Sequence, residues 1–146
     1  MFRIDTEFRK QILAEAPEIV RCFQCSACVG GCLAARYLGN FNPRMKILSA
    51  LYGRKDELND ILFNCAMCNS CNERCPQDVN PFEVLIKLKN IAVRLGLVSE
   101  EKLATSKMVV DTGWGFVITS HTDSTREQLG LPPVKKTDVL KRLVEE

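Results

Sequence analysis

Hydrophobic positions along much of the chain recur every three or four residues, the period of an α-helix with one buried face. The clearest pattern starts at Asn80 and Pro81, a pair typical of a helix start, and ends at Gly96. Its apolar face is formed by Val84, Leu85, Leu88, Ile91, Ala92 and Leu95. The sequence therefore predicts a long amphipathic helix over this stretch.

Three weaker helical patterns precede it. Residues 5–20 predict a short amphipathic helix that Pro17 interrupts. Residues 42–53 open on a second Asn–Pro pair and close on a glycine, which favours a capped helix. Residues 56–63 place their apolar side chains on one side, so this spacer is predicted to be helical and not a hairpin.

The pattern weakens toward the C-terminus. Residues 99–110 predict another helix, with a serine cap and two glutamates in its first turn. Glycines and prolines interrupt residues 111–134, which predicts loop with one short helix near 124–129. Residues 137–146 predict a final helix. We therefore expect an all-α domain over residues 1–110 and a partly irregular extension over residues 111–146, with docking to a partner as its expected role.

Composition narrows the possible locations and ligands. The chain of 146 residues has a formal net charge of +2, and 26% of its residues are charged without a long run of one sign, so nucleic-acid binding is not expected. The first ten residues carry five charges, unlike a signal peptide. No apolar run reaches the roughly 18 residues that span a bilayer. We expect a cytoplasmic protein without direct membrane insertion.

The chemistry is concentrated in eight cysteines that form two groups with identical spacing. Each group reads C-x2-C-x2-C-x3-C, and the two groups are Cys22, Cys25, Cys28 and Cys32, then Cys65, Cys68, Cys71 and Cys75. Three thiolates at this spacing suit three corners of a [4Fe–4S] cubane. A duplicated spacing is stronger evidence than a single copy, so the sequence predicts two [4Fe–4S] clusters.

The fourth cysteine of each group is predicted to serve the other cluster. In two-cluster ferredoxins the last cysteine of such a run ligates the partner cluster, which joins the two halves around a pseudo-two-fold axis. The predicted ligands of the first cluster are Cys22, Cys25, Cys28 and Cys75. Those of the second cluster are Cys65, Cys68, Cys71 and Cys32.

Two other uses of the cysteines compete with this interpretation. Zinc ribbons use pairs of C-x2-C separated by a longer loop, a less close match than three cysteines in one tight run. A disulfide scaffold belongs to secreted chains. With four thiolates on each cluster, no iron keeps an open position for a substrate, so electron transfer is the expected role and no catalytic residue is predicted.

Helical patterns separate the two motifs, whereas short bacterial ferredoxins have hairpin-rich linkers, and this indicates the α-helical ferredoxin fold. The stretches CFQCSACVGGC, NPRMKILSALYG and FNCAMCNSCNERCPQDVNPFEVL resemble the C subunit of heterodisulfide reductase. The resemblance covers roughly residues 21–96. One position departs from the pattern: Pro76 follows Cys75, whereas Leu33 follows Cys32 where a proline is usual.

The resemblance implies a non-catalytic relay subunit of an oxidoreductase complex. Such a protein carries electrons from a flavin subunit, or from a membrane cytochrome, to a cysteine-rich catalytic subunit that reduces a heterodisulfide. Two alternatives remain open at the sequence level. One is a freely diffusing two-cluster ferredoxin, and the other is the iron–sulfur subunit of another flavin dehydrogenase of the succinate or glycolate type.

Overall fold

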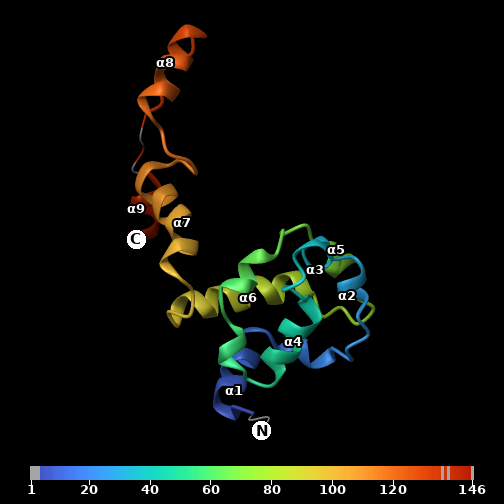
Figure 1. The fold of residues 1–146 in the computed structure, drawn as a ribbon. Coiled ribbons are helices and arrows are strands. Elements are labelled where there is room, and N and C mark those ends of the chain that lie inside the picture. Colours follow the sequence, from blue (N-terminus) through green and yellow to red (C-terminus); the bar gives the residue numbers. More distant parts are fainter. Residues whose placement is uncertain (1–3, 136, 138, 146) are drawn as a thin grey trace. The chain divides into compact units, whose positions relative to one another are not determined.

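The computed structural model describes residues 4–135, 137 and 139–145, and every regular element in them is helical (Figure 1). The predicted all-α class is confirmed. The chain separates into two compact units, Met1–Val98 and Ser99–Glu146. This division precedes the predicted boundary between residues 110 and 111, because residue 110 lies inside a helix of the second unit.

Both units consist of short helices. The first unit contains α1 (Thr6–Glu15), η1 (Pro17–Arg21), α2 (Ala27–Gly30), α3 (Leu33–Leu38), α4 (Pro43–Leu51), η2 (Lys55–Glu57), η3 (Asp60–Asn64), α5 (Ser70–Glu73) and α6 (Pro81–Arg94), where η marks a 3-10 helix. The second unit contains α7 (Glu100–Thr112), α8 (Ser120–Gln128) and α9 (Val139–Glu145).

Helix α1 closes one side of the first unit. It begins where the Asp5 carboxylate accepts a hydrogen bond from the Phe8 amide at 2.9 Å, the usual way to satisfy a free N–H at a helix start. It ends before Pro17, as the sequence predicts, and the chain continues as η1. Phe8 and Ile12 are buried on the face that packs against α4.

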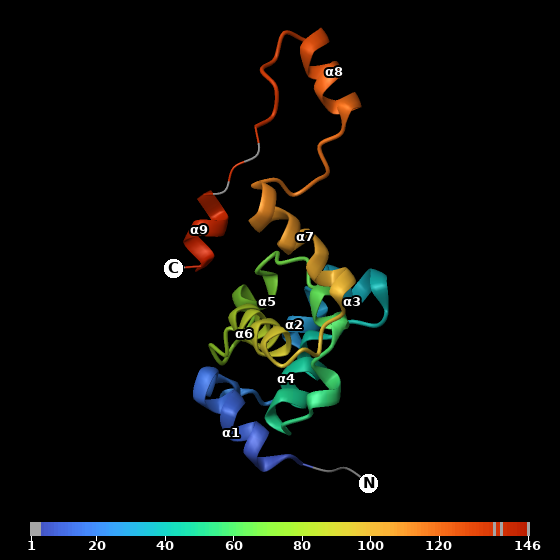
Figure 2. The same ribbon diagram turned by 90° about the vertical axis from the view of Figure 1, so that its left-hand side faces the viewer.

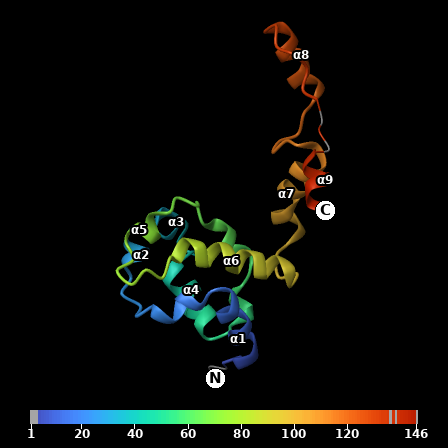
Figure 3. The same ribbon diagram turned by 180° about the vertical axis from the view of Figure 1, so that it is seen from behind.

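The first unit is built from one series of elements that occurs twice. A 3-10 helix (η1 or η3) leads into each cysteine motif, a one-turn helix (α2 or α5) lies inside it, and a longer helix (α4 or α6) follows an Asn–Pro pair. α2 contacts α5 and α4 contacts α6, so like elements of the two copies pair with each other (Figures 1 and 3). The buried face of α6 supplies much of the core between them.

The two Asn–Pro pairs differ in detail. Asn42 caps α4, since its side chain accepts a hydrogen bond from the Met45 amide at 3.2 Å. Asn80 instead has φ of 52° and makes no capping hydrogen bond through its side chain, although α6 begins at the predicted residue. The predicted helical spacer at 56–63 is present as 3-10 turns, in η2 and η3.

In the second unit α7 packs against α9, while α8 stands apart from both in all three views (Figure 2). Helix α8 covers the predicted short helix, and α9 falls within the predicted final helix, of which residues 138 and 146 lie outside the described part of the chain. Across the described residues, none of the helices combines the length and the hydropathy that crossing a membrane requires.

Candidate iron–sulfur centres

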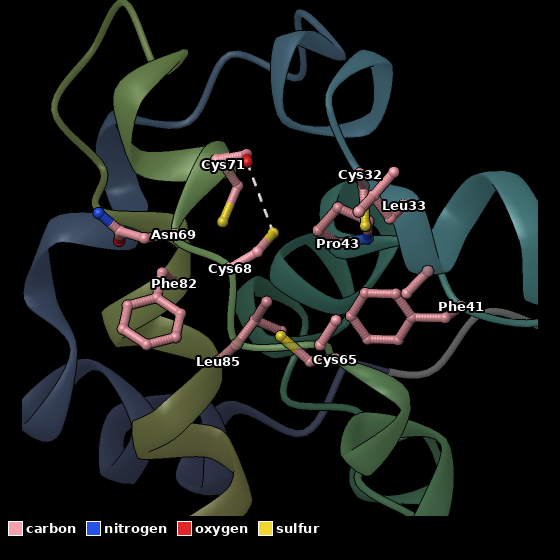
Figure 4. A pocket seen from close by; sticks show the side chains of 13 residues that line it. Cys32, Leu33, Phe41, Pro43, Cys65, Cys68, Asn69, Cys71, Phe82 and Leu85 are labelled. Carbon is pink, nitrogen blue, oxygen red and sulfur yellow. Dashed lines mark hydrogen bonds between the residues drawn. The ribbon is translucent and has the colours of Figure 1, made fainter.

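The fold gathers the eight cysteines around two pockets. The first pocket is lined by Cys22, Cys25, Cys28 and Cys75. The second pocket is lined by Cys65, Cys68, Cys71 and Cys32. Figure 4 shows the second pocket, with three cysteines of its own motif on one side and Cys32 on the other. Each pocket therefore combines three cysteines of one motif with the last cysteine of the other.

Residues in the left-handed backbone conformation orient the cysteines of each motif. Gln24 and Ser26 have φ of 63° and 70°, and Met67 and Asn69 have φ of 54° and 61°. In each motif these residues flank the second cysteine, so the same turn is made twice. Side chains with a Cβ adopt this conformation at a cost of about 1–2 kcal/mol per residue. Its presence at both motifs indicates a local geometry held for the site.

The last cysteine of each motif accepts a backbone hydrogen bond. Cys32 precedes α3, and its Sγ accepts from the Ala35 amide at 3.4 Å. Cys75 Sγ accepts from the Val79 amide at 3.4 Å. These two hydrogen bonds fix the position of the sulfur atom in the last cysteine of each motif.

Burial disfavours ionisation of the cysteine at the centre of each site. Burial raises the pKa of Cys28 to about 11, and the nearby Cys22 adds to this effect. Burial likewise raises the pKa of Cys71 to about 11, together with Cys65. At Cys68 the pKa is lowered, because its exposed sulfur makes a hydrogen bond with the Ser70 hydroxyl at 3.5 Å. Four thiolates in one pocket therefore need a strongly positive centre to hold them together.

The donor set fits an iron–sulfur cluster. In the described residues, no group of three or more His, Cys, Asp or Glu side chains converges closely enough to hold a single metal ion. Each set of four thiols instead lines one pocket. One nitrogen at the first pocket also lacks an acceptor: Arg44 Nε is buried without a hydrogen-bond partner among the described residues.

Two residues near the cysteines were not predicted as part of a site. Gln24 donates a hydrogen bond through Nε2 to Cys22 Sγ at 3.2 Å, and Arg44 lines the first pocket from α4. Neither stands out in the sequence, because a single polar residue in a motif loop or in a helix carries no periodic signal. Arg44 comes near the first motif through the packing of α4 beside it, whereas Gln24 lies in the motif itself, two residues from Cys22.

The single histidine, the single tryptophan and Arg74 lie outside the two cysteine pockets. His121 is exposed on α8 in the second unit. Trp114 donates through Nε1 to the Lys135 carbonyl at 3.1 Å and contacts the Phe116 ring edge-on. Arg74 is exposed, and its side chain lies close over Gly31, where an added Cβ would meet Nε at 2.4 Å.

Leu33 stands where a proline is usual, and the chain after it differs from the second motif. It is the first residue of α3, a position whose amide needs no partner within the helix. Pro76, which follows Cys75, lies instead in a turn outside any helix.

An all-helical fold with two four-cysteine pockets defines the class of two-cluster iron–sulfur proteins that transfer electrons. Residues 18–79 match a protein family described as "4Fe-4S dicluster domain". The cofactors of the chain are two [4Fe–4S] clusters, and its eight cysteines match in number the four thiolates that each cluster requires.

The relatives narrow this class to one family. The chain is 34% identical to the C subunit of the "Ferredoxin/F(420)H(2)-dependent CoB-CoM heterodisulfide reductase" of Methanosarcina acetivorans, over 90% of this chain and 81% of that protein. It is 34% identical to the C subunit of the "H(2):CoB-CoM heterodisulfide,ferredoxin reductase" of Methanothermobacter thermautotrophicus, over 92% of this chain and 74% of that protein. The chain belongs to the family of heterodisulfide reductase C subunits, whose members are iron–sulfur subunits of an oxidoreductase complex.

Proposed function

We propose that this chain is the electron-relay subunit of a heterodisulfide reductase-type complex, placed between a flavin or cytochrome subunit and a cysteine-rich catalytic subunit. The observation that carries the proposal is the pair of pockets with four cysteines each. Four protein thiolates leave no iron open to a substrate, so a bound cluster has electrons to exchange and no substrate to bind. The cytoplasm is its predicted location.

The proposed ligand sets are the crossed ones. Cys22, Cys25, Cys28 and Cys75 would hold the first cluster, and Cys65, Cys68, Cys71 and Cys32 would hold the second. The pocket linings support this assignment, because each brings the last cysteine of one motif beside the first three of the other. The amide hydrogen bonds to Cys32 and Cys75 also support it, since they fix both sulfurs in place, the first at the start of α3 and the second in the turn before α6.

Each side chain in the pockets contributes to the transfer in a definite way. When bound, a [4Fe–4S] cluster supplies one-electron transfer with little change in geometry. The cysteines fix its position, the left-handed turns orient them, and apolar residues such as Ile47 and Leu85 line the pockets and reduce contact with water. An electron relay needs a protein that holds its cluster in a fixed position and changes little in structure when the electron arrives or leaves.

The C-terminal extension over residues 111–146 is the proposed docking element for a partner subunit. Its described residues expose several large apolar side chains: Phe116, Val117, Leu129, Val139, Leu143 and Val144. Exposed apolar groups that occur together are typical of protein interfaces. No nucleic acid is proposed as a partner.

The experiment that tests the relay role is anaerobic purification of the tagged chain from its native cell, with counting of iron per chain. We expect about eight irons on the chain, and co-purification with a cysteine-rich catalytic subunit and a flavoprotein. A lone iron-loaded monomer would instead establish a mobile ferredoxin. Zinc in place of iron would overturn the assignment of the cofactors.

The ligand sets are tested by replacing the crossing cysteines one at a time. Cys75→Ser should damage the cluster of the first motif, and Cys32→Ser should damage the cluster of the second. The two clusters are followed by their electron paramagnetic resonance spectra in the reduced protein. Loss of only the second cluster in Cys75→Ser would refute the crossed assignment.

A further inference from the structure

The two pockets have the same framework but differ at one pair of corresponding positions. Helices α4 and α6 each begin at the proline of an Asn–Pro pair, and the residue after that proline lines a pocket. At the first pocket this residue is Arg44, and at the second it is Phe82. Figure 4 shows the Phe82 ring at the second pocket. The duplicated fold thus places a cation at one site and an aromatic ring at the other.

The guanidinium of Arg44 is positioned to interact with something that fills the first pocket. Its Nε is buried and has no hydrogen-bond partner among the described residues. A buried charged N–H without an acceptor is costly, so native proteins satisfy such groups with protein, water or a ligand. The cluster sulfurs proposed for this pocket are acceptors, and a guanidinium keeps its charge at any relevant pH.

Gln24 is a second difference between the pockets, and like Arg44 it favours negative charge at the first pocket. Its Nε2 donates to Cys22 Sγ at 3.2 Å, and its Oε1 is buried without a partner in the described structure. The corresponding residue of the second motif is Met67, which has no N–H on its side chain and is 56% exposed. The first site therefore receives an additional donor from its own motif loop.

Donors that the two sites share do not distinguish them. The last cysteine of each motif accepts one backbone amide at 3.4 Å, Cys75 at the first site and Cys32 at the second. At the second site the exposed Cys68 sulfur also forms hydrogen bonds with the neutral Ser70 hydroxyl and the Ser70 backbone. Among the described residues that line the second pocket none is charged, whereas the first pocket has Arg44.

We propose that Arg44, assisted by Gln24, sets the midpoint potential of the first cluster above that of the second. The proposal rests on the crossed ligand sets proposed above. Reduction adds one negative charge to a cluster, and a nearby fixed cation stabilises that charge more than it stabilises the oxidised form. Hydrogen bonds to the ligating sulfurs act in the same direction. An electron shared between the two sites therefore rests predominantly at the first.

The test is a redox titration of the full chain carrying both clusters, followed by electron paramagnetic resonance. In Arg44→Gln the ratio of reduced to oxidised first cluster, at a fixed potential, should fall by about tenfold, which for one electron is about 59 mV. The second cluster should change by less than about twofold. Arg44→Lys retains the charge and should retain most of the potential. Equal shifts of both clusters, or no shift, in Arg44→Gln overturn the proposal.

Phe82→Arg is the reciprocal variant, and it keeps the proposal testable if Arg44→Gln loses iron. It should raise the potential of the second cluster and leave the first unchanged, and an unchanged second cluster overturns the proposal. Cys75→Ser and Cys32→Ser assign each signal to its pocket independently. An uncrossed pattern in those two variants refutes the ligand sets, whereas a crossed pattern with no effect of Arg44→Gln refutes only the role of Arg44.

Discussion

Gly53 is the position where the smallest change should have a large and interpretable effect. It follows α4 with φ of 66°, and the start of α1 lies directly against it. A Cβ at Gly53 would lie 2.2 Å from the backbone oxygen of Asp5 and 2.9 Å from the Arg9 nitrogen. Gly96 is a matched control, because it follows α6 with φ of 65° and an added Cβ there meets nothing within 4 Å.

Both substitutions destabilise the protein by straining the backbone, but only Gly53→Ala also creates a steric clash with α1. At both sites alanine must adopt a left-handed conformation, which costs about 1–2 kcal/mol and is partly offset by about 0.4–1 kcal/mol from the less flexible unfolded chain. At Gly53 the start of α1 must also move by roughly 1 Å to restore an ordinary C···O contact. That movement breaks the Asp5 cap on Phe8, worth about 1 kcal/mol, and exposes part of the buried Phe8 ring. We expect Gly53→Ala to cost about 3 kcal/mol, against about 1 kcal/mol for Gly96→Ala.

The assay is anaerobic urea unfolding of the protein with both clusters bound, followed by far-ultraviolet circular dichroism and by the visible absorption of the clusters. For a slope of about 1–3 kcal/mol/M, the extra 2 kcal/mol at Gly53 lowers the midpoint by roughly 1 M relative to the Gly96→Ala control. Equal midpoints for the two variants would show that α1 does not need this close approach, and would refute the packing argument.

Two other expectations follow from groups beside the motifs. The Glu18 carboxylate accepts a hydrogen bond from Lys87 Nζ at 2.7 Å. Burial opposes ionisation of Glu18, but the contact with Lys87 outweighs it and lowers the pKa of Glu18 below 4.5. Glu18→Gln should therefore cost about 1 kcal/mol at pH 7, reduced from a fully buried pair because Lys87 is 35% exposed. The contribution of this pair to the free energy of unfolding should stay constant down to about pH 5 and disappear as the pH falls through the lowered pKa of Glu18. It is measured as the coupling energy of a double-mutant cycle with Lys87→Gln. Ile19 and Leu62 precede the two motifs and are fully buried, so replacing either with alanine should cost about 2–5 kcal/mol by urea unfolding, whereas Leu95→Ala, at an exposed site, should cost less than about 1 kcal/mol.

The helices that surround the motifs could be predicted because their signals are local. An Asn–Pro pair and a following apolar period locate α4 and α6 within a residue of their observed starts. Pro17 ends the first helix for a reason that is visible in the sequence alone. The spacer at 56–63 was predicted as helical, but periodicity does not distinguish a 3-10 turn from an α-helix over so few residues.

The left-handed turns of the motifs had no such signal. Gln24 and Met67 adopt positive φ although neither residue type favours it, because the position of the following cysteine decides the backbone there. The one-turn helices α2 and α5 are too short to show a period. The positive φ values and the one-turn helices are set by the site as a whole. They can be predicted from the cysteine spacing only if a bound cluster is assumed.

A duplicated fold whose pockets each combine cysteines of both motifs constrains where its two sites can differ. Because each pocket takes its last cysteine from the other motif, neither half of the first unit supplies a complete set of four thiols. The pairing of α2 with α5 and of α4 with α6 therefore holds both pockets at once, and a change in that pairing affects both alike. A difference in potential has to come from side chains that diverge between the copies without entering that packing. Arg44 and Phe82 occupy corresponding positions at the two pockets and differ in charge, so the proposal assigns the difference in potential to this pair.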